Sequence, residues 1–101
     1  MSVSLLFYRT FDRSLKSLDS HQVQIVGFII EALQVYFLYN FDIEKARSIQ
    51  PGFFYKQLRK PYFEAGVEGK LRVVLEKNDN TIYAIFAGNH DQVRRFLLRP
   101  Y

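Results

Sequence analysis

The sequence predicts one α+β domain in which helices cover a small antiparallel sheet. Two observations predict it: a long segment with helical periodicity comes early, and short segments with strand alternation follow it, separated by turns. The predicted order is β-α-α-β-β-β-α, with two N-terminal helices packed on one face of the sheet and a short C-terminal helix. Because strands set apart from helices are typical of α+β domains, we expect the helices to be segregated on one face.

The composition is that of a single folded domain spanning residues 1–101. Hydrophobic residues make up 49% of the chain and charged residues 24%, which excludes the composition of a disordered protein. A chain of this length buries one core and has room for one site. The sequence has no cysteine, which excludes disulfides, zinc knuckles and thiol nucleophiles. We recognise no secretory signal, so a cytoplasmic location is the default expectation.

The first two predicted elements are short. A strand is predicted over Val3–Tyr8, a short apolar run with β-branched and aromatic members. Asp12 is expected to cap a helical turn through residues 13–18, because Leu15 and Leu18 share one face of that turn.

The long helix is the clearest element, predicted over His21–Asn40 with Asp19 or Ser20 as its cap. Its polar positions gather in a narrow stripe and apolar residues cover the rest, so we expect burial over most of its circumference. The extra apolar surface is either core or a docking surface for a partner, including a second copy of the chain. Glu31 and two glutamines interrupt the apolar run Val23–Leu38, which therefore falls short of a membrane span. The stripe contains Ser20, Gln24, Gly27, Glu31 and Gln34.

Residues 41–60 have no clear periodicity. Residues 42–48 are expected to add an extra turn of helix, and a Pro-Gly pair then breaks the chain. The aromatic residues 53–55 have two interpretations: they clamp nucleic acid together with basic neighbours, or they anchor a loop to the core. The basic neighbours are Lys56, Arg59 and Lys60.

The remaining predicted elements lie in the C-terminal half. Alternation in the middle strand of this half places a Leu-Val-Leu stripe on one face and Arg72 on the other. Asp91 is expected to cap the last helix. The strands are predicted over Tyr62–Val67, Leu71–Lys77 and Thr81–Ala87, and the helix over Gln92–Leu98.

The net charge of +4 is carried by residues 51–101, while residues 1–50 are neutral. A one-sided positive field favours nucleic acid or an acidic protein as partner, or else it is an ordinary solvated surface. The sequence has no nucleotide-binding glycine loop and no zinc or calcium spacing. We therefore expect neither a metal site nor a cofactor.

Arg72, His90 and Glu64 are the candidates for general acid–base chemistry on an anion. The guanidinium of Arg72 is a bidentate donor suited to phosphate, or else it forms a cross-strand ion pair with Glu64 or Glu76 on a solvated face. His90 follows the last strand in an exposed turn, where it either exchanges protons near neutral pH or has no partner. His21 is expected only to begin the long helix.

The segment YFEAGVEGKLRVVLEKNDNTIYAIFAGNHDQVRRFL, residues 62–97, resembles the C-terminal half of the RelE/ParE toxin superfamily. The resemblance rests on four features: the Arg-Val-Val strand core, the polar turn, the apolar strand, and the turn with glycine and histidine that follows it. It implies a toxin of a toxin–antitoxin pair, with a cognate antitoxin protein as partner. In the ribonuclease branch, the toxin cleaves messenger RNA on the ribosome by attack of a ribose 2′-hydroxyl on the adjacent phosphate.

The resemblance also implies roles for individual residues. Arg72 matches the arginine that holds the scissile phosphate, and His90 lies where a further cation or proton carrier is supplied. Glu64 and Tyr101 complete the predicted catalytic set. RNA is expected to contact the other cations of the basic half, which are Lys56, Arg59, Lys60, Lys70, Arg94, Arg95 and Arg99.

Two positions depart from the family pattern. The second predicted strand has Glu64 and no cation where several active members have paired lysines, and Phe96 stands near the place of a catalytic tyrosine. The alternative is therefore a non-nuclease member, either a ParE-like inhibitor of DNA gyrase or an inactive RelE-like binding protein. We expect no membrane partner, and the apolar long helix offers a surface for a homodimer.

Overall fold

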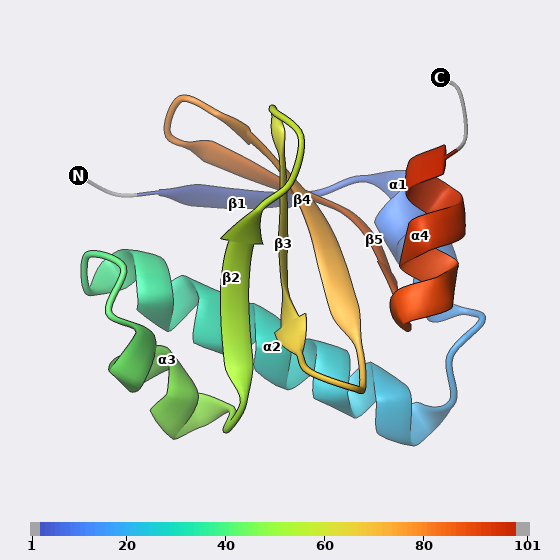
Figure 1. The fold of residues 1–101 in the computed structure, drawn as a ribbon, viewed down its shortest axis with the longest axis horizontal. Coiled ribbons are helices and arrows are strands. Elements are labelled where there is room, and N and C mark those ends of the chain that lie inside the picture. The colour runs from blue at the N-terminus through green and yellow to red at the C-terminus, as the bar shows by residue number, and fades with distance from the viewer. Residues whose placement is uncertain (1–2, 99–101) are drawn as a thin grey trace.

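The computed structural model describes residues 3–98, which form one five-stranded sheet with helices on both faces (Figure 1). The α+β class is confirmed. Two elements are added to the predicted order: the helix α3, where one extra turn is expected, and the strand β2. The elements are β1 (Ser4–Phe7), α1 (Arg9–Leu15), α2 (Ser20–Leu38), α3 (Ile43–Ile49), β2 (Phe53–Gln57), β3 (Tyr62–Val67), β4 (Arg72–Asn78), β5 (Thr81–Gly88) and α4 (His90–Leu98).

The sheet is mixed, with the strand order β1-β5-β4-β3-β2. β2, β3, β4 and β5 form a consecutive antiparallel meander. β1 pairs parallel to β5, with Ser4 opposite Thr81. The first strand of the chain therefore lies beside the last strand, and the sheet is mostly rather than wholly antiparallel.

Strand β2 is the main addition to the predicted fold. Phe53 lies opposite Val67 of β3 and is fully buried. Tyr55 packs against the same core, whereas Phe54 and Lys56 alternate to the other face. The aromatic cluster therefore anchors a strand rather than a loop, and one of its three rings faces away from the main core.

Helix α1 covers the part of β5 that β1 does not reach. β1 ends at Phe7. Beyond it, Thr10 Oγ1 donates a hydrogen bond to the carbonyl oxygen of Ile85 at 2.6 Å, and Ser14 Oγ accepts one from the N–H of Ala87 at 2.9 Å. Two hydroxyl groups thus satisfy backbone groups that would otherwise lie unpaired at a buried sheet edge.

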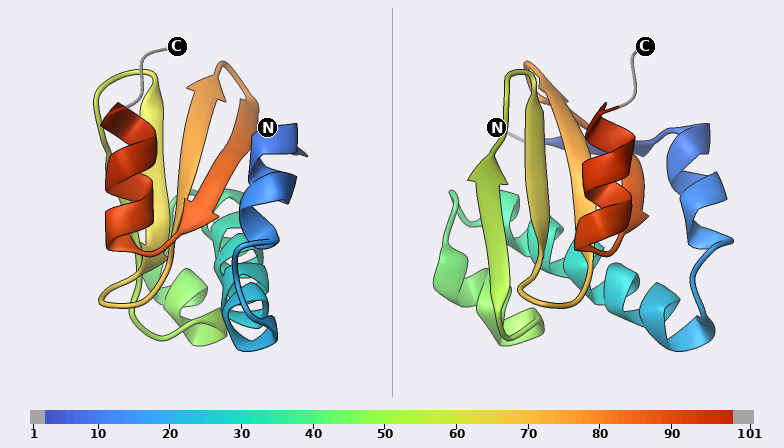
Figure 2. Two further views of the ribbon diagram at one scale, coloured as in Figure 1. Left: turned by 90° about the vertical axis from the view of Figure 1, so that its right-hand side faces the viewer. Right: turned by 45° about the vertical axis from the view of Figure 1, so that its right-hand side comes forward.

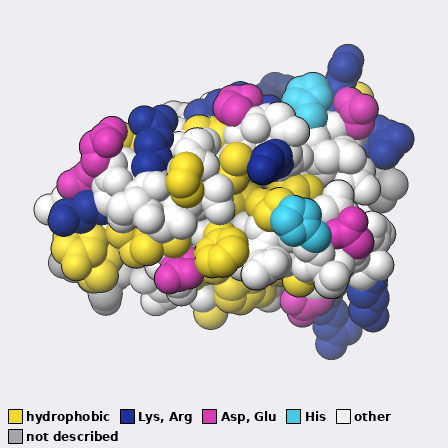
Figure 3. All heavy atoms as spheres, turned by 90° about the horizontal axis from the view of Figure 1, so that it is seen from below, with side chains coloured by type: hydrophobic (Ala, Val, Ile, Leu, Met, Phe, Trp, Pro, Cys, Tyr) yellow, Lys and Arg dark blue, Asp and Glu magenta, His cyan; other side chains and the backbone are white. Residues whose placement is uncertain are grey.

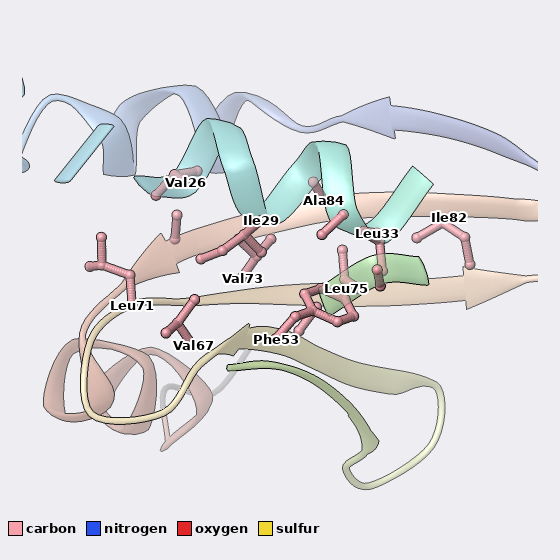
Figure 4. Close-up of a cluster of buried hydrophobic side chains, with 14 of the residues drawn as sticks. Val26, Ile29, Leu33, Phe53, Val67, Leu71, Val73, Leu75, Ile82 and Ala84 are labelled. Atoms are coloured by element: carbon pink, nitrogen blue, oxygen red, sulfur yellow. The ribbon is translucent and has the colours of Figure 1, made fainter. Parts of the chain in front are cut away.

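Helix α2 packs against one face of the sheet and closes the main core. Its predicted cap is confirmed: Asp19 Oδ1 accepts from the N–H of Gln22 at 2.8 Å, and the Gln22 side chain accepts from the N–H of Asp19 at 3.0 Å. The side chains on its inner face point toward the sheet (Figure 4). The contributing residues are Val26, Ile29, Ala32 and Leu33 from α2, with Phe53, Val73, Leu75, Ile82 and Ala84 from the strands.

The outer face of α2 is more exposed than its sequence predicts. Val23, Phe28 and Leu38 are exposed, and only four α2 residues are fully buried. The prediction that α2 is buried over most of its circumference is therefore wrong within a single chain. Seen from below, where α2 and α3 lie, the surface carries hydrophobic patches separated by polar and charged side chains (Figure 3).

Among the described helices, α2 is the one that is long and apolar enough, by length and composition, to cross a membrane. The prediction that this segment falls short of a membrane span is wrong by that measure. Its inner face nevertheless belongs to the core shared with the sheet, which gives its apolar residues a role in folding the domain.

Helix α4 packs on the opposite face of the sheet from α2 (Figure 2). Val93 and Phe96 form a second cluster with Val74 and Ile85, and Phe96 stacks on Phe86 with ring centroids 4.4 Å apart. The prediction that all helices share one face is wrong for α4. The reason is that Val74 leaves apolar surface on the second face, which the last helix covers.

Two of the predicted helix caps are wrong. Helix α1 begins at Arg9, directly after β1, so Asp12 lies inside its first turn. Helix α4 begins before Asp91 and is capped by Asn89, whose side chain accepts from the N–H of Gln92 at 2.8 Å. The Gln92 side chain accepts in return from the N–H of Asn89 at 2.8 Å, which completes a reciprocal cap.

Candidate functional site

A row of four residues crosses the α4 face of the sheet. Phe54 of β2 lies opposite Gly66 of β3, and Gly66 lies opposite Arg72 of β4. Arg72 in turn lies opposite Gly88 of β5. Directly opposite residues of antiparallel strands project to the same face, so Arg72 is flanked by a glycine on each side. Its guanidinium carbon lies 5.3 Å from the centre of the Phe54 ring, in a cation–π contact.

Gly66 provides the space for this arrangement. A Cβ atom at Gly66 would lie 2.9 Å from Arg72 Cα and 3.2 Å from Arg72 Cγ, and it would clash with the carbonyl oxygen of Leu71. Two of these contacts are with backbone atoms, which cannot move aside cheaply. Gly66 is thus required by the close approach of the β4 backbone at Leu71 and Arg72.

Glu64 is the buried carboxylate of the site, with 3% of its surface exposed. Its Oε1 accepts a hydrogen bond from Arg72 Nη1 at 3.0 Å and lies 3.4 Å from Lys56 Nζ. Arg72 Nη2 lies 3.5 Å from Glu68 Oε2. The ion pair between Arg72 and Glu64 foreseen from the sequence is present, but not on a solvated face, because the Arg72 side chain is only 12% exposed.

A pocket of about 270 Å³ opens between these strands and helix α4. It brings together five of the predicted site residues: Lys56, Glu64, Arg72, His90 and Arg94. An apolar wall completes it, formed by Leu58, Val93, Leu97 and Leu98. A second pocket of about 270 Å³ adjoins it and shares Arg72 and His90, so that these two residues line both spaces. Its remaining lining comes from Gly69, Lys70, Asn89 and Asp91.

His90 is the first residue of α4 and is well exposed. Its Nδ1 lies 3.5 Å from Asp91 Oδ1. Because the ring remains accessible from both pockets, it can exchange protons with solvent or with a bound molecule. Within residues 3–98, no three His, Asp or Glu side chains are grouped so that they could hold a metal ion.

The other predicted site residues do not all join this pocket. Lys70 lines only the second pocket. Arg59 and Lys60 lie between β2 and β3 and line neither pocket. Arg95 faces a different cleft, on the far side of α4. Arg99 and Tyr101 lie outside the described residues.

Sequence reasoning missed Glu68, and it named Phe54 within the aromatic residues 53–55 without placing it beside Arg72. Phe54 carries Lys56 as well as Arg72 near its ring, at 5.6 Å and 5.3 Å from the centroid. Its position follows from alternation within β2, so recognising that strand would have placed it beside Arg72. Glu68 lies four residues before Arg72 across the β3–β4 turn, and the turn brings the two together.

The arrangement is suited to binding an anion and to moving protons beside it. Arg72 is held by Glu64 and Glu68 in a fixed orientation, while Lys56 and Arg94 add positive charge at the rim. A preorganised guanidinium is a strong partner for a phosphate group. His90 is the accessible imidazole of the pocket and can act as a proton carrier. Glu64, by contrast, already neutralises two cations.

Comparison with known proteins gives a fold. No family model matches the sequence and no curated protein matches it. A chain of the RelB–RelE antitoxin–toxin complex from Methanococcus jannaschii aligns with a TM-score of 0.59 over 90% of this chain and 96% of that chain, at 20% identity. A copper-bound mutant toxin from Helicobacter pylori aligns with a TM-score of 0.55 over 90% and 98% of the two chains, at 15% identity.

Each alignment covers 90% of this chain. This chain therefore shares its architecture with these two solved structures. This protein has the RelE/ParE-like fold that residues 62–97 predict.

Proposed function

We propose that the protein is the toxin of a toxin–antitoxin module and acts in the cytoplasm as a ribosome-dependent endoribonuclease on messenger RNA. The observation that carries the proposal is the pocket in which a partly buried, ion-paired Arg72 meets Lys56, His90 and Arg94. The RelE-like fold supports messenger RNA as the class of target. Together they supply the charge and the proton carrier that phosphodiester cleavage requires.

The proposed reaction needs no group from outside the RNA and the protein. The ribose 2′-oxygen forms a bond to phosphorus as the bond to the 5′-oxygen breaks, which leaves a cyclic phosphate and a 5′-hydroxyl. The 2′-hydroxyl gives up a proton and the leaving oxygen takes one up. Arg72 is the group placed to stabilise the charge that develops on the phosphate oxygens, and His90 is the group placed to carry a proton.

Glu64 has a different part in this scheme. A general base must be free to accept a proton, and Glu64 is buried under Arg72 and Lys56. In the resting state it orients the guanidinium of Arg72. It takes a direct part in proton transfer only if bound RNA draws Lys56 or Arg72 away from it.

Growth arrest on induction and cleavage of ribosome-bound messages test the proposal. Arg72→Ala is expected to reduce cleavage about 10²- to 10³-fold, the loss typical when one group that stabilises a developing charge is removed. His90→Ala is expected to reduce it by a comparable factor. Arg9→Ala removes an exposed arginine on α1 and serves as the control. Unchanged growth arrest and cleavage in both pocket variants would show that the mechanism is wrong.

A cognate antitoxin is the proposed protein partner. The similar fold from Methanococcus jannaschii was solved in an antitoxin–toxin complex. The charge of this chain, +4 and confined to residues 51–101, favours a partner with acidic segments.

Association of two copies through α2 stays a prediction, and sedimentation of Phe28→Glu against the unsubstituted protein tests it, because Phe28 is exposed on that helix.

A non-nuclease toxin or binding protein is the second candidate. The observation that favours it is the ion pairing of Glu64, the only buried carboxylate of the described residues. With Glu64 ion-paired, the described pocket has no unpaired carboxylate, and His90 is its accessible imidazole. Inhibition of DNA supercoiling by purified gyrase, with no message cleavage, is the result that would favour a gyrase-directed toxin. No toxicity on induction would favour an inactive binding protein.

A further inference from the structure

A further cleft, separate from the two pockets described above, lies on the other side of helix α4 from Arg72. It has a volume of about 370 Å³ and sits between α1 and α4, where the end of β5 separates the two helices (Figure 2). Phe86 and Phe96, which stack on one another, form its apolar floor. Its polar walls come from Thr10, Arg13, Ser14 and Ser17 on one side and from Gln92 and Arg95 on the other.

The two arginines of this cleft come from different elements and face one space. Both are exposed, and within residues 3–98 neither makes an ion pair or a side-chain hydrogen bond. No carboxylate lines the cleft. Arg13 and Arg95 therefore add to a local positive potential that no described acidic side chain in the cleft offsets.

The neutral polar groups of the cleft divide into two kinds. The hydroxyls of Thr10 and Ser14 are already bonded to the edge of β5 and cannot turn toward a ligand without exposing it. The Gln92 side chain uses its oxygen to cap α4, which leaves its amide N–H groups as donors. Ser17 also lines the cleft. The groups that can still form hydrogen bonds with a ligand are thus mainly donors, and donors suit an anion.

We propose that this cleft binds a backbone phosphate of the same single-stranded RNA that occupies the pocket of Arg72; this inference rests on the proposed function. The two spaces lie on either side of α4, with Arg94 lining the first and Arg95 the second. A helix is about 10–12 Å across with its side chains, a width that a few nucleotides of an extended strand can cross. The RNA path runs from Arg72 past Arg94 and over α4 to Arg95 and Arg13.

The salt dependence of RNA binding tests the path. The ligand is a short single-stranded RNA with 2′-O-methyl riboses, which cannot be cleaved by attack of a 2′-hydroxyl. Each phosphate contact with a single strand contributes about 0.7 to the slope of log K against log salt concentration. Arg13→Gln with Arg95→Gln is therefore expected to lower the slope by about 0.7 for one shared phosphate and up to about twice that for two.

A matched pair of charge removals controls for the loss of net charge. Arg9→Gln with Lys16→Gln removes two exposed cations of the α1 region that do not line the cleft. The inference is overturned if the two double variants change the slope equally. It is also overturned if the cleft variant binds RNA normally but loses binding to poly-glutamate, since the cleft would then serve an acidic protein.

The outcomes separate this inference from the proposed function. If Arg72→Ala abolishes growth arrest while the cleft variant keeps the original slope, the nuclease stands and the RNA path is wrong. If the slope falls in the cleft variant while Arg72→Ala leaves growth arrest intact, the cleft binds RNA in a protein that does not use Arg72 for cleavage. Thermal unfolding of each variant verifies that the fold is intact.

Discussion

Substituting Gly66 by alanine tests the claim that this glycine makes room for Arg72. The added Cβ would lie 2.9 Å from Arg72 Cα and would clash with the carbonyl oxygen of Leu71, so β3 and β4 must separate locally. Forcing an extra carbon into a well-packed site typically costs about 1–3 kcal/mol. Since Arg72 is held by Glu64 across this point, we also expect the guanidinium to shift and message cleavage to fall.

The chain offers a matched control for this substitution. Gly27 lies inside helix α2, and a Cβ there meets nothing within 4 Å. Gly27→Ala is therefore expected to stabilise the protein by about 0.5–1 kcal/mol, because alanine loses less backbone entropy in a helix. The chain has no tryptophan, so urea unfolding followed by circular dichroism measures the free energy of unfolding of both variants. The reasoning is refuted if Gly66→Ala is as stable and as active as the unsubstituted chain.

Three further predictions concern Glu64, Asn89 and Tyr55. Glu64→Gln weakens the bond to Arg72 and is expected to lower the free energy of unfolding by about 2 kcal/mol, the range for hydrogen bonds to charged groups; equal stability in urea would contradict this. Asn89→Ala removes the cap of α4 and should cost about 1 kcal/mol, with Asp91→Ala, which caps nothing, as its control. Burial is the main cause that raises the pKa of Tyr55 well above its ordinary value near 10, and the nearby Tyr36 adds to it. The folded state then holds its proton longer than the unfolded state, so stability is complete below about pH 10 and falls above it. Tyr55→Phe should flatten that fall, as measured by unfolding midpoints across alkaline pH, and an unchanged slope would argue against burial as the cause.

Local signals in the sequence were sufficient for the long helix α2 and for the antiparallel strands β4 and β5. Asp19 and Gln22 have the spacing of a reciprocal cap, and the two share both hydrogen bonds. The strand that contains Arg72 alternates clearly, because one of its faces is the main core. These features depend on neighbours within a few residues, which a sequence displays directly.

The missed features depend on contacts between distant residues. Strand β2 is only five residues long and becomes recognisable through its pairing with β3. The face chosen by α4 depends on the apolar surface that Val74 and Ile85 leave uncovered. The burial of Glu64 likewise follows from three strands and a helix meeting around it, so the sequence offered its ion pair with Arg72 only as one alternative and on a solvated face.

The pairing of the first strand with the last has a consequence for how the chain folds during synthesis. Ser4 of β1 pairs with Thr81 of β5, which lies 77 positions later in the chain (81 − 4 = 77). At roughly 5–20 residues per second, the N-terminal segment waits about 4–15 s on the ribosome before its partner strand is made. Interrupted chains that end before Thr81 keep β1 without the strand it pairs with. This edge of the sheet can therefore close only in chains that have been translated past β5.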